Sequence, residues 1–170
     1  MLLDRSGVID DVWTVIGEDD ALPDGPAILP AARLAELAGV AHPVGVHIDN
    51  AADPRSLQPV LDRLGLISVA FPSFADGRGF SIARLLRELG FMGRLRATGP
   101  VIADQFAYLL ECGFDEVSLP ETVAARQPAD QWLAQLDRLS AGYQRGALPG
   151  ATDRGAGRQS ILDQRRAASS

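Results

Sequence analysis

The chain contains no lysine, one cysteine and two histidines, and each scarcity excludes a class of site. Without lysine there is no Walker phosphate loop, which needs that residue beside its glycines. A single cysteine, Cys112, excludes an intramolecular disulfide and any zinc or iron–sulfur site built from several cysteines of one chain. The histidines, His42 and His47, are spaced to suit neither one helix face nor one strand face. We therefore predict no metal site and no nucleotide site of the Walker kind.

Long apolar stretches and an excess of positive charge are also missing. The net charge is −6 and the isoelectric point is near 4.8, whereas surfaces for nucleic acid or anionic membranes need clustered positive charge. The N-terminus, MLLDRSGVIDDVW, lacks the apolar core of a signal peptide, and no later run approaches the roughly 18 apolar residues of a spanning helix. These absences predict a cytoplasmic protein that binds neither nucleic acid nor membranes.

What the chain does contain is a regular alternation of strand and helix signals. Short apolar runs with β-branched residues, bounded by glycine and proline, predict strands at 27–30, 44–48, 66–71, 95–98 and 116–119. Between them, apolar residues recur at helical spacing. This order implies a mainly parallel sheet with right-handed crossovers. We expect a single α/β domain of repeated βα units, either half-barrel-like or an open doubly wound sheet, because five units are too few for an eight-fold barrel.

The clearest helix signal lies at residues 54–64. Asp53 is a natural N-cap, Pro54 suits the first helical position, and Gly65 suits the end. The whole chain divides into an N-terminal segment at 1–20, the α/β domain at 21–145 and a tail at 146–170. Glycine, alanine, serine and charged residues dominate the tail, so we expect most of it to be disordered.

The loop ADGRGFS, after the third predicted strand, carries the densest polar chemistry in the chain. Parallel α/β folds place ligands at the carboxyl ends of their strands, where this loop lies. Gly77 and Gly79 permit positive φ and close backbone approach. Arg78 offers a planar pair of donors to a carboxylate, sulfate, sulfite or phosphate group. Asp76 would hold Arg78 or cap the helix that follows.

The same residues also fit an ordinary turn. Asp-Gly followed by a second glycine is a common turn sequence, and Ser81 would then only cap the helix. Arg84 and Glu88 would form a surface ion pair at i and i+4. The spacing GRG matches neither the GxGxxG dinucleotide fingerprint nor a Walker loop. From the residues alone, an anion site and a plain turn both stay open.

Arg96 is a charged residue between two apolar residues of a predicted strand. Burying a guanidinium is costly unless a carboxylate pairs with it, so a partner is required. The candidate partners are Asp76, Asp104 and Glu88. Asp104 and Gln105 begin a predicted helix, where Asp104 is either a favourable charge near the positive helix end or a partner of Arg78 or Arg96.

Two segments, FPSFADGRGFSIARLLRELGF and GRLRATGPVIADQFAYLLECGFDEV, resemble the signature of a bacterial family known as domain of unknown function 934. The resemblance covers about residues 11 to 119. Residues that match the signature are Asp76, Gly77, Arg78, Gly79, Ser81, Arg84, Arg87, Glu88, Arg96, Asp104 and Gln105. The chain departs from it where Ser73 and Ala103 replace basic residues, where Pro100 replaces an aspartate, and where Glu111 replaces a basic residue. The centre of the predicted site is therefore kept while its periphery is changed.

The resemblance implies a pathway rather than a reaction. Members of this family are commonly encoded beside assimilatory sulfite reductase and phosphoadenylylsulfate reductase, and they are often labelled oxidoreductases. We expect an accessory or binding protein of sulfate and sulfite reduction, without a self-contained activity or a cofactor of its own. Its site would bind a small oxyanion or dock one of those reductases. The alternative is an oxidoreductase subunit of the same pathway that uses a partner's cofactor.

The ligand-binding residues that we predict are Asp76, Gly77, Arg78, Gly79, Ser81, Arg96, Asp104 and Gln105. No catalytic residue is assigned.

Overall fold

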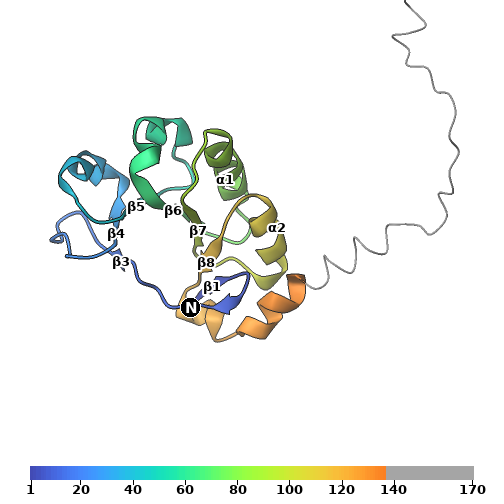
Figure 1. Cartoon of the computed structure of the whole chain (residues 1–170). Helices are drawn as coiled ribbons and strands as arrows, with labels where there is room; N and C mark the ends of the chain where they lie inside the picture. Colours follow the sequence, from blue (N-terminus) through green and yellow to red (C-terminus); the bar gives the residue numbers. More distant parts are fainter. Residues whose placement is uncertain (137–170) are drawn as a thin grey trace, which may run out of the picture. The chain divides into compact units, whose positions relative to one another are not determined.

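The computed structural model describes residues 1–136, which form a single eight-stranded sheet with helices (Figure 1). The strands are β1 (Leu2–Asp4), β2 (Gly7–Val8), β3 (Thr14–Val15), β4 (Ala27–Pro30), β5 (Val44–Ile48), β6 (Leu64–Ala70), β7 (Arg94–Thr98) and β8 (Glu116–Ser118). Their order across the sheet is β2-β1-β8-β7-β6-β5-β4-β3. Neighbours from β3 to β8 are parallel, whereas β1 pairs antiparallel with both β8 and β2.

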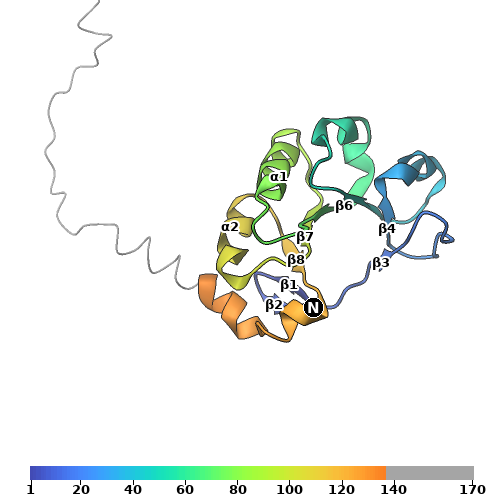
Figure 2. The same cartoon turned by 180° about the vertical axis from the view of Figure 1, so that it is seen from behind.

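All five strands predicted from the sequence are present, and all pair in parallel. β4 and β5 have the predicted bounds, whereas β6 begins two residues earlier than predicted, at Leu64. The crossover helices lie along one face of the sheet, and the sheet curves around the opposite face (Figures 1 and 2). The described part is thus an α/β half-barrel.

The first 20 residues, expected only as an N-terminal segment, contain β1, β2 and β3. β2 and β3 are the two edges of the sheet, and residues 9–13 cross between them on the side without helices (Figure 2). Strands of two or three residues are too short to show an alternating pattern, so the sequence did not indicate them. The crossing segment carries Asp11 and Trp13 to the helix-free face of the sheet, as their contacts below show.

The helices are η1 (Ala31–Gly39), η2 (Pro54–Arg63), α1 (Arg78–Glu88), η3 (Ala103–Gln105), α2 (Phe106–Glu111) and α3 (Glu121–Ala124), followed by a helix at 129–136. No helix within residues 1–136 is long and apolar enough to cross a bilayer. The predicted end of the domain at 145 and the tail at 146–170 lie outside the described residues.

The helix predicted at 54–64 is η2, a 3₁₀ helix that ends at Arg63. Asp53 caps it as predicted, because its carboxylate accepts a hydrogen bond from the Arg55 backbone N–H at 3.1 Å. Pro59 lies inside η2 and has no N–H to donate, which removes one α-helical hydrogen bond. Gly65, predicted to end this helix, instead belongs to β6, where the register with β5 shifts and the Trp13 ring packs over the glycine.

The two faces of the sheet differ in chemistry. The helix-covered face carries the core, which includes Leu29, Val46, Ile67, Leu95 and Val117 of the strands and Leu57, Ile82, Leu86 and Phe106 of the helices. Residues of opposite pleat on β5, β6, β7 and β8 form one row across the helix-free face: His47, Ser68, Arg96 and Glu116. Three of these four polar side chains are buried. This row of four side chains therefore makes the interior of the half-barrel polar.

Candidate functional site

The predicted site loop connects β6 to α1 at the carboxyl end of the sheet, and Asp76 is its centre. The Asp76 carboxylate accepts hydrogen bonds from Arg78 Nε at 3.0 Å, from Arg78 Nη2 at 2.6 Å and from the Arg78 backbone N–H at 3.2 Å. The Arg78 guanidinium thereby holds the pKa of this carboxyl well below its usual range. The prediction that Asp76 holds Arg78 is confirmed; the same carboxylate accepts the N–H of the first residue of α1, but the N-cap position is Gly77 and has no side-chain cap.

A third residue joins this pair from another loop. Asn50, which follows β5, is buried and donates from Nδ2 to Asp76 Oδ2 at 2.7 Å. Two neighbouring carboxyl-end loops therefore meet at the Asp76 carboxylate. Arg78 itself is open to solvent, with 60% of its side chain exposed, and its Nη1 has no partner among residues 1–136.

The two glycines of the loop do not use the positive φ that glycine permits. Gly77 has φ −82°, and the glycines in the left-handed region are Gly7, Gly90, Gly99 and Gly113. Gly79 is needed for packing, because an ideal Cβ at this position would lie 2.3 Å from Cζ of the buried Phe71 ring. The start of α1 thus packs directly on an aromatic ring of the core.

We expect Gly79→Ala to lower the free energy of unfolding by about 2 kcal/mol, because the added methyl group must displace the Phe71 ring inside a filled core. Gly77→Ala is the matched control, since its Cβ would meet nothing closer than 3.8 Å and its φ suits alanine. That control should change stability by less than about 0.5 kcal/mol. Urea unfolding of both variants measures the difference. Equal losses in the two variants would contradict the packing role of Gly79.

The other predicted residues of this region divide into two groups. Gln105 joins the site, because its Nε2 donates to the Phe74 carbonyl of the same loop at 2.7 Å while its Oε1 accepts from the Ile102 N–H at 3.2 Å. Ser81 and Asp104 are exposed, and their side chains form no hydrogen bond within the part of the chain that the structure describes. The structure therefore links loops after β5, β6 and β7 through Asn50 and Gln105.

The predicted Arg84–Glu88 surface pair does not form. Arg84 instead donates to the Tyr108 hydroxyl at 3.2 Å and lies over the Tyr108 ring, 5.4 Å from its centroid. A ring on the neighbouring helix offers this guanidinium a second mode of contact, through its π face, that a flexible glutamate does not. Cys112 is a buried free thiol.

Arg96 is buried and paired, as predicted, but all three predicted partners are wrong. It donates to Glu116 Oε1 at 2.7 Å from Nε, and to the two carboxylate oxygens of Asp11 at 2.7 and 2.9 Å. Glu116 stands directly opposite Arg96 on β8, and Asp11 lies in the crossing segment. Arg96 therefore belongs to a structural ion-pair cluster on the helix-free face. It forms no bond with Asp76, Gly77, Arg78 or Gly79, the residues of the DGRG loop.

Part of this pairing could have been found from the sequence. Glu116 opens the next predicted strand, and a buried arginine in one parallel strand is most easily matched by a carboxylate at the same height in its neighbour. No sequence signal places Asp11 there, because it lies 85 residues away in a segment without a recognisable pattern.

Sequence analysis also missed a chain of hydrogen bonds beside Arg96. His47 Nδ1 lies 2.9 Å from Ser68 Oγ, and Ser68 Oγ lies 2.8 Å from Thr98 Oγ1. Burial lowers the pKa of His47, so the imidazole is neutral at pH 7 and one ring nitrogen can accept a proton. His47 and Ser68 lie in the same row as Arg96, and Thr98 lies two residues further along β7 toward the carboxyl-end loops.

A known bacterial protein family matches the chain. The model of a family described as "Bacterial protein of unknown function (DUF934)" matches residues 45–151, which is more than half of the chain. The chain therefore belongs to this bacterial family, as the resemblance of its motifs implied. The match includes Asn50, the DGRG loop, Arg96 and Gln105. No curated protein matches the chain.

Proposed function

We propose, from this family membership and the geometry of the DGRG loop, that the protein is an accessory binding protein of assimilatory sulfate and sulfite reduction. Its site would bind a small oxyanion at Arg78. One observation carries the proposal: the Arg78 guanidinium is held in a fixed orientation by Asp76 and is still largely exposed at the carboxyl end of the sheet. The link to sulfur metabolism comes from the resemblance of the motifs to the family signature.

The donor geometry of Arg78 suits an oxyanion. A guanidinium has five N–H donors in one plane, and two of them are used on Asp76. The remaining donors form a fork that can reach two oxygens of a sulfite, sulfate or phosphate group at once. Arg78 also begins α1, where the positive end of the helix favours negative charge.

Asp76 orients Arg78 without depending on pH in the physiological range. Because the pKa of the Asp76 carboxyl lies well below its usual value, the carboxylate stays ionised and the pair stays formed. Arg96 has no such role in the proposal, since its guanidinium is committed to Glu116 and Asp11. The working charge of the proposed site is therefore Arg78 alone.

We expect Arg78→Ala to abolish function while leaving stability nearly unchanged, because an exposed loop residue at a helix start buries little apolar surface. The measurement is growth of a strain that lacks the protein, with sulfate as sole sulfur source and with cysteine as rescue. Calorimetric titration of the purified full chain with sulfite and sulfate measures the binding step itself. Wild type should restore growth and bind one of these anions, whereas Arg78→Ala should do neither.

Arg55→Ala is the matched control for this experiment. Arg55 is the second residue of η2, follows an aspartate by two residues and is exposed, but its ion contact with Asp53 is long at 3.8 Å. This variant should grow and bind as wild type does. Normal growth with Arg78→Ala, or normal growth of the deletion strain on sulfate, would contradict the site or the pathway respectively.

The same loop supports docking of a partner reductase as a second candidate function. Phe74, two residues before Asp76, is 53% exposed. An exposed aromatic ring beside an oriented guanidinium is the composition of many interface centres. Affinity purification from the native host grown on sulfate distinguishes the two candidates. Recovery of sulfite reductase or phosphoadenylylsulfate reductase with wild type, and its loss with Phe74→Ser, supports docking; it would also fit a subunit that uses its partner's cofactor.

A further inference from the structure

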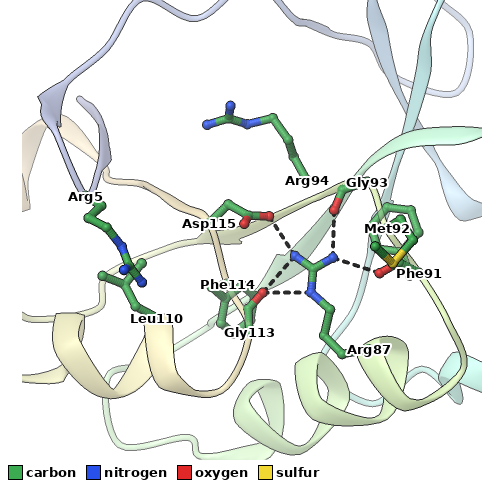
Figure 3. Close-up of a pocket in the computed structure, with 10 residues that line it drawn as sticks. All are labelled: Arg5, Arg87, Phe91, Met92, Gly93, Arg94, Leu110, Gly113, Phe114 and Asp115. Carbon is green, nitrogen blue, oxygen red and sulfur yellow. Dashed lines mark hydrogen bonds and ion pairs between the residues drawn. The ribbon is translucent and has the colours of Figure 1, made fainter.

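A pocket of about 630 Å³ lies at the end of the sheet opposite to the DGRG loop (Figure 3). Arg94, the first residue of β7, and Asp115, just before β8, mark it as lying at the amino ends of these strands. In Figure 3, Arg5 projects into it from the turn between β1 and β2, while Leu110 and Arg87 come from α2 and α1. An adjoining depression of about 280 Å³ is also lined by Arg5, Arg94 and Asp115, so the two form one surface feature.

Arg87 builds the wall of this pocket. Its guanidinium donates to the carbonyls of Gly113 at 3.0 and 2.9 Å, of Phe91 at 2.8 Å and of Gly93 at 2.8 Å, and to Asp115 Oδ2 at 2.7 Å. These bonds tie the loop before β7 to the loop before β8. Asp115 Oδ2 also accepts the Leu95 backbone N–H at 2.7 Å. The wall is thus preorganised, and the one carboxylate that lines the larger pocket is already engaged.

Arg5 supplies a positive charge that is not paired directly with any carboxylate of residues 1–136, although Asp4 lines the adjoining depression. Its side chain forms no hydrogen bond or ion pair with any of residues 1–136. Arg94 is half exposed and shares Glu116, at 2.6 Å, with the buried Arg96. Three guanidinium groups and two carboxylates, Asp115 and Asp4, therefore line the combined feature in a chain whose net charge is −6, and Asp4 lies 3.8 Å from Arg94 rather than against Arg5. In such a chain, a pocket with an excess of positive charge selects anions by contrast with the rest of the surface.

The remaining lining is apolar. Leu110 and Phe114 form part of the wall, and Met92 at the rim is 91% exposed. A pocket of this volume falls in the usual range for small ligands, about 300 to 1,000 Å³, and an apolar wall with a few charged groups is their usual surrounding. Methionine suits such a rim because its flexible thioether adapts to different apolar groups.

We propose that this pocket binds a small organic anion: an apolar or aromatic body against Leu110, Phe114 and Met92, with a carboxylate, sulfonate or phosphate group on Arg5. The site is separate from the proposed oxyanion site at Arg78, because the two lie at opposite ends of the parallel strands. The two proposals can therefore fail independently.

The test uses phenyl phosphate as the charged probe and benzyl alcohol as its neutral counterpart. Binding to the full chain is followed by backbone amide chemical-shift changes on titration. Phenyl phosphate should shift the amides of residues 91–94 and 110–115, and Arg5→Glu should weaken its binding about tenfold or more, as expected for loss of one charge-assisted contact. Benzyl alcohol should bind at least about tenfold more weakly than phenyl phosphate for the same reason.

Arg126→Glu is the matched control, because Arg126 is also exposed and its side chain also has no partner among the described residues. It changes the net charge equally and should leave binding unchanged, as should Arg78→Ala. Inorganic phosphate should shift these amides more weakly than phenyl phosphate does. The proposal is wrong if Arg5→Glu binds like wild type, if Arg126→Glu weakens binding equally, if benzyl alcohol binds as well as phenyl phosphate, or if Arg78→Ala removes the shifts.

Discussion

Replacing Gly99 with alanine is expected to lower the free energy of unfolding by about 4 kcal/mol, the sum of a strained backbone and an overfilled site. Gly99 follows β7 and has φ +140°, a conformation that is nearly restricted to glycine. An ideal Cβ there would lie 2.0 Å from the backbone carbonyl oxygen of Phe71. Because that atom is backbone, no side-chain rotation relieves the clash.

The surrounding hydrogen bonds leave Gly99 little room to move. Its N–H donates to the Ser118 carbonyl at 3.1 Å, its carbonyl accepts from the Val101 N–H at 2.9 Å, and the Phe71 N–H donates to Thr98 O at 2.8 Å. Phe71 opens the loop that carries Asp76 and Arg78. A shift at Gly99 would therefore displace the candidate site as well as weaken the fold.

Gly90→Ala is the matched control for Gly99→Ala. Gly90 also has positive φ, at +92°, but its Cβ would meet no atom within 4 Å. Gly90→Ala should lower the free energy of unfolding only by the cost of placing alanine at positive φ, about 1 kcal/mol. Urea unfolding of the two variants separates the cost of positive φ from the cost of the clash with Phe71. If Gly99→Ala loses no more stability than Gly90→Ala, the backbone at Gly99 moves without cost and the prediction is wrong.

Arg96→Ala is expected to lower the free energy of unfolding by about 3 kcal/mol, the lower end of the range for breaking a buried ion pair. Arg96 and Glu116 are each only 2% exposed, so removing the guanidinium leaves a buried carboxylate with one neighbour fewer. The cost stays at the lower end because Arg94 still bonds to Glu116 at 2.6 Å. Asp11 would also lose its partner, which frees the segment that crosses the helix-free face.

Arg94→Ala tests whether burial is the cause of the stability loss expected for Arg96→Ala. Arg94 lies on the same strand and bonds to the same glutamate, but about half of its side chain is exposed. Exposed pairs contribute at most about 1 kcal/mol, so this variant should be far less destabilised than Arg96→Ala. Unfolding in urea at pH 7 measures both. Similar losses for the two arginines would contradict the account of Arg96 as a desolvated charge.

Strands β4 to β8 were predictable because each is a short run bounded by turn residues. β4 and β5 have the predicted bounds, and Asp53 caps η2 as its position before Pro54 indicated. The strands of the first 20 residues were not predictable, since they are only two or three residues long, and β1 joins the sheet through β8, more than 100 residues away.

Some contacts of the candidate site could likewise be predicted from the sequence, and others could not. Asp76 and Arg78 are two residues apart, so their mutual bonds follow from local geometry and could be predicted. The role of Gly79 could not, because it depends on where the Phe71 ring is placed by the core. The hydrogen-bond chain from His47 to Thr98 also depends on the register of three neighbouring strands.

By itself, the sequence determined the features that neighbouring residues decide: the order of strands and helices, the cap of η2, and the Asp76–Arg78 pair. The physical reason is that propensity, turn chemistry and short-range hydrogen bonds act within a few residues of chain. Only the tertiary structure decided that Glu116 and Asp11 neutralise Arg96, and that Arg5 lines a pocket while forming no ion pair with any residue of 1–136. Burial and charge balance depend on which distant segments come to share a surface, and the half-barrel brings those segments together.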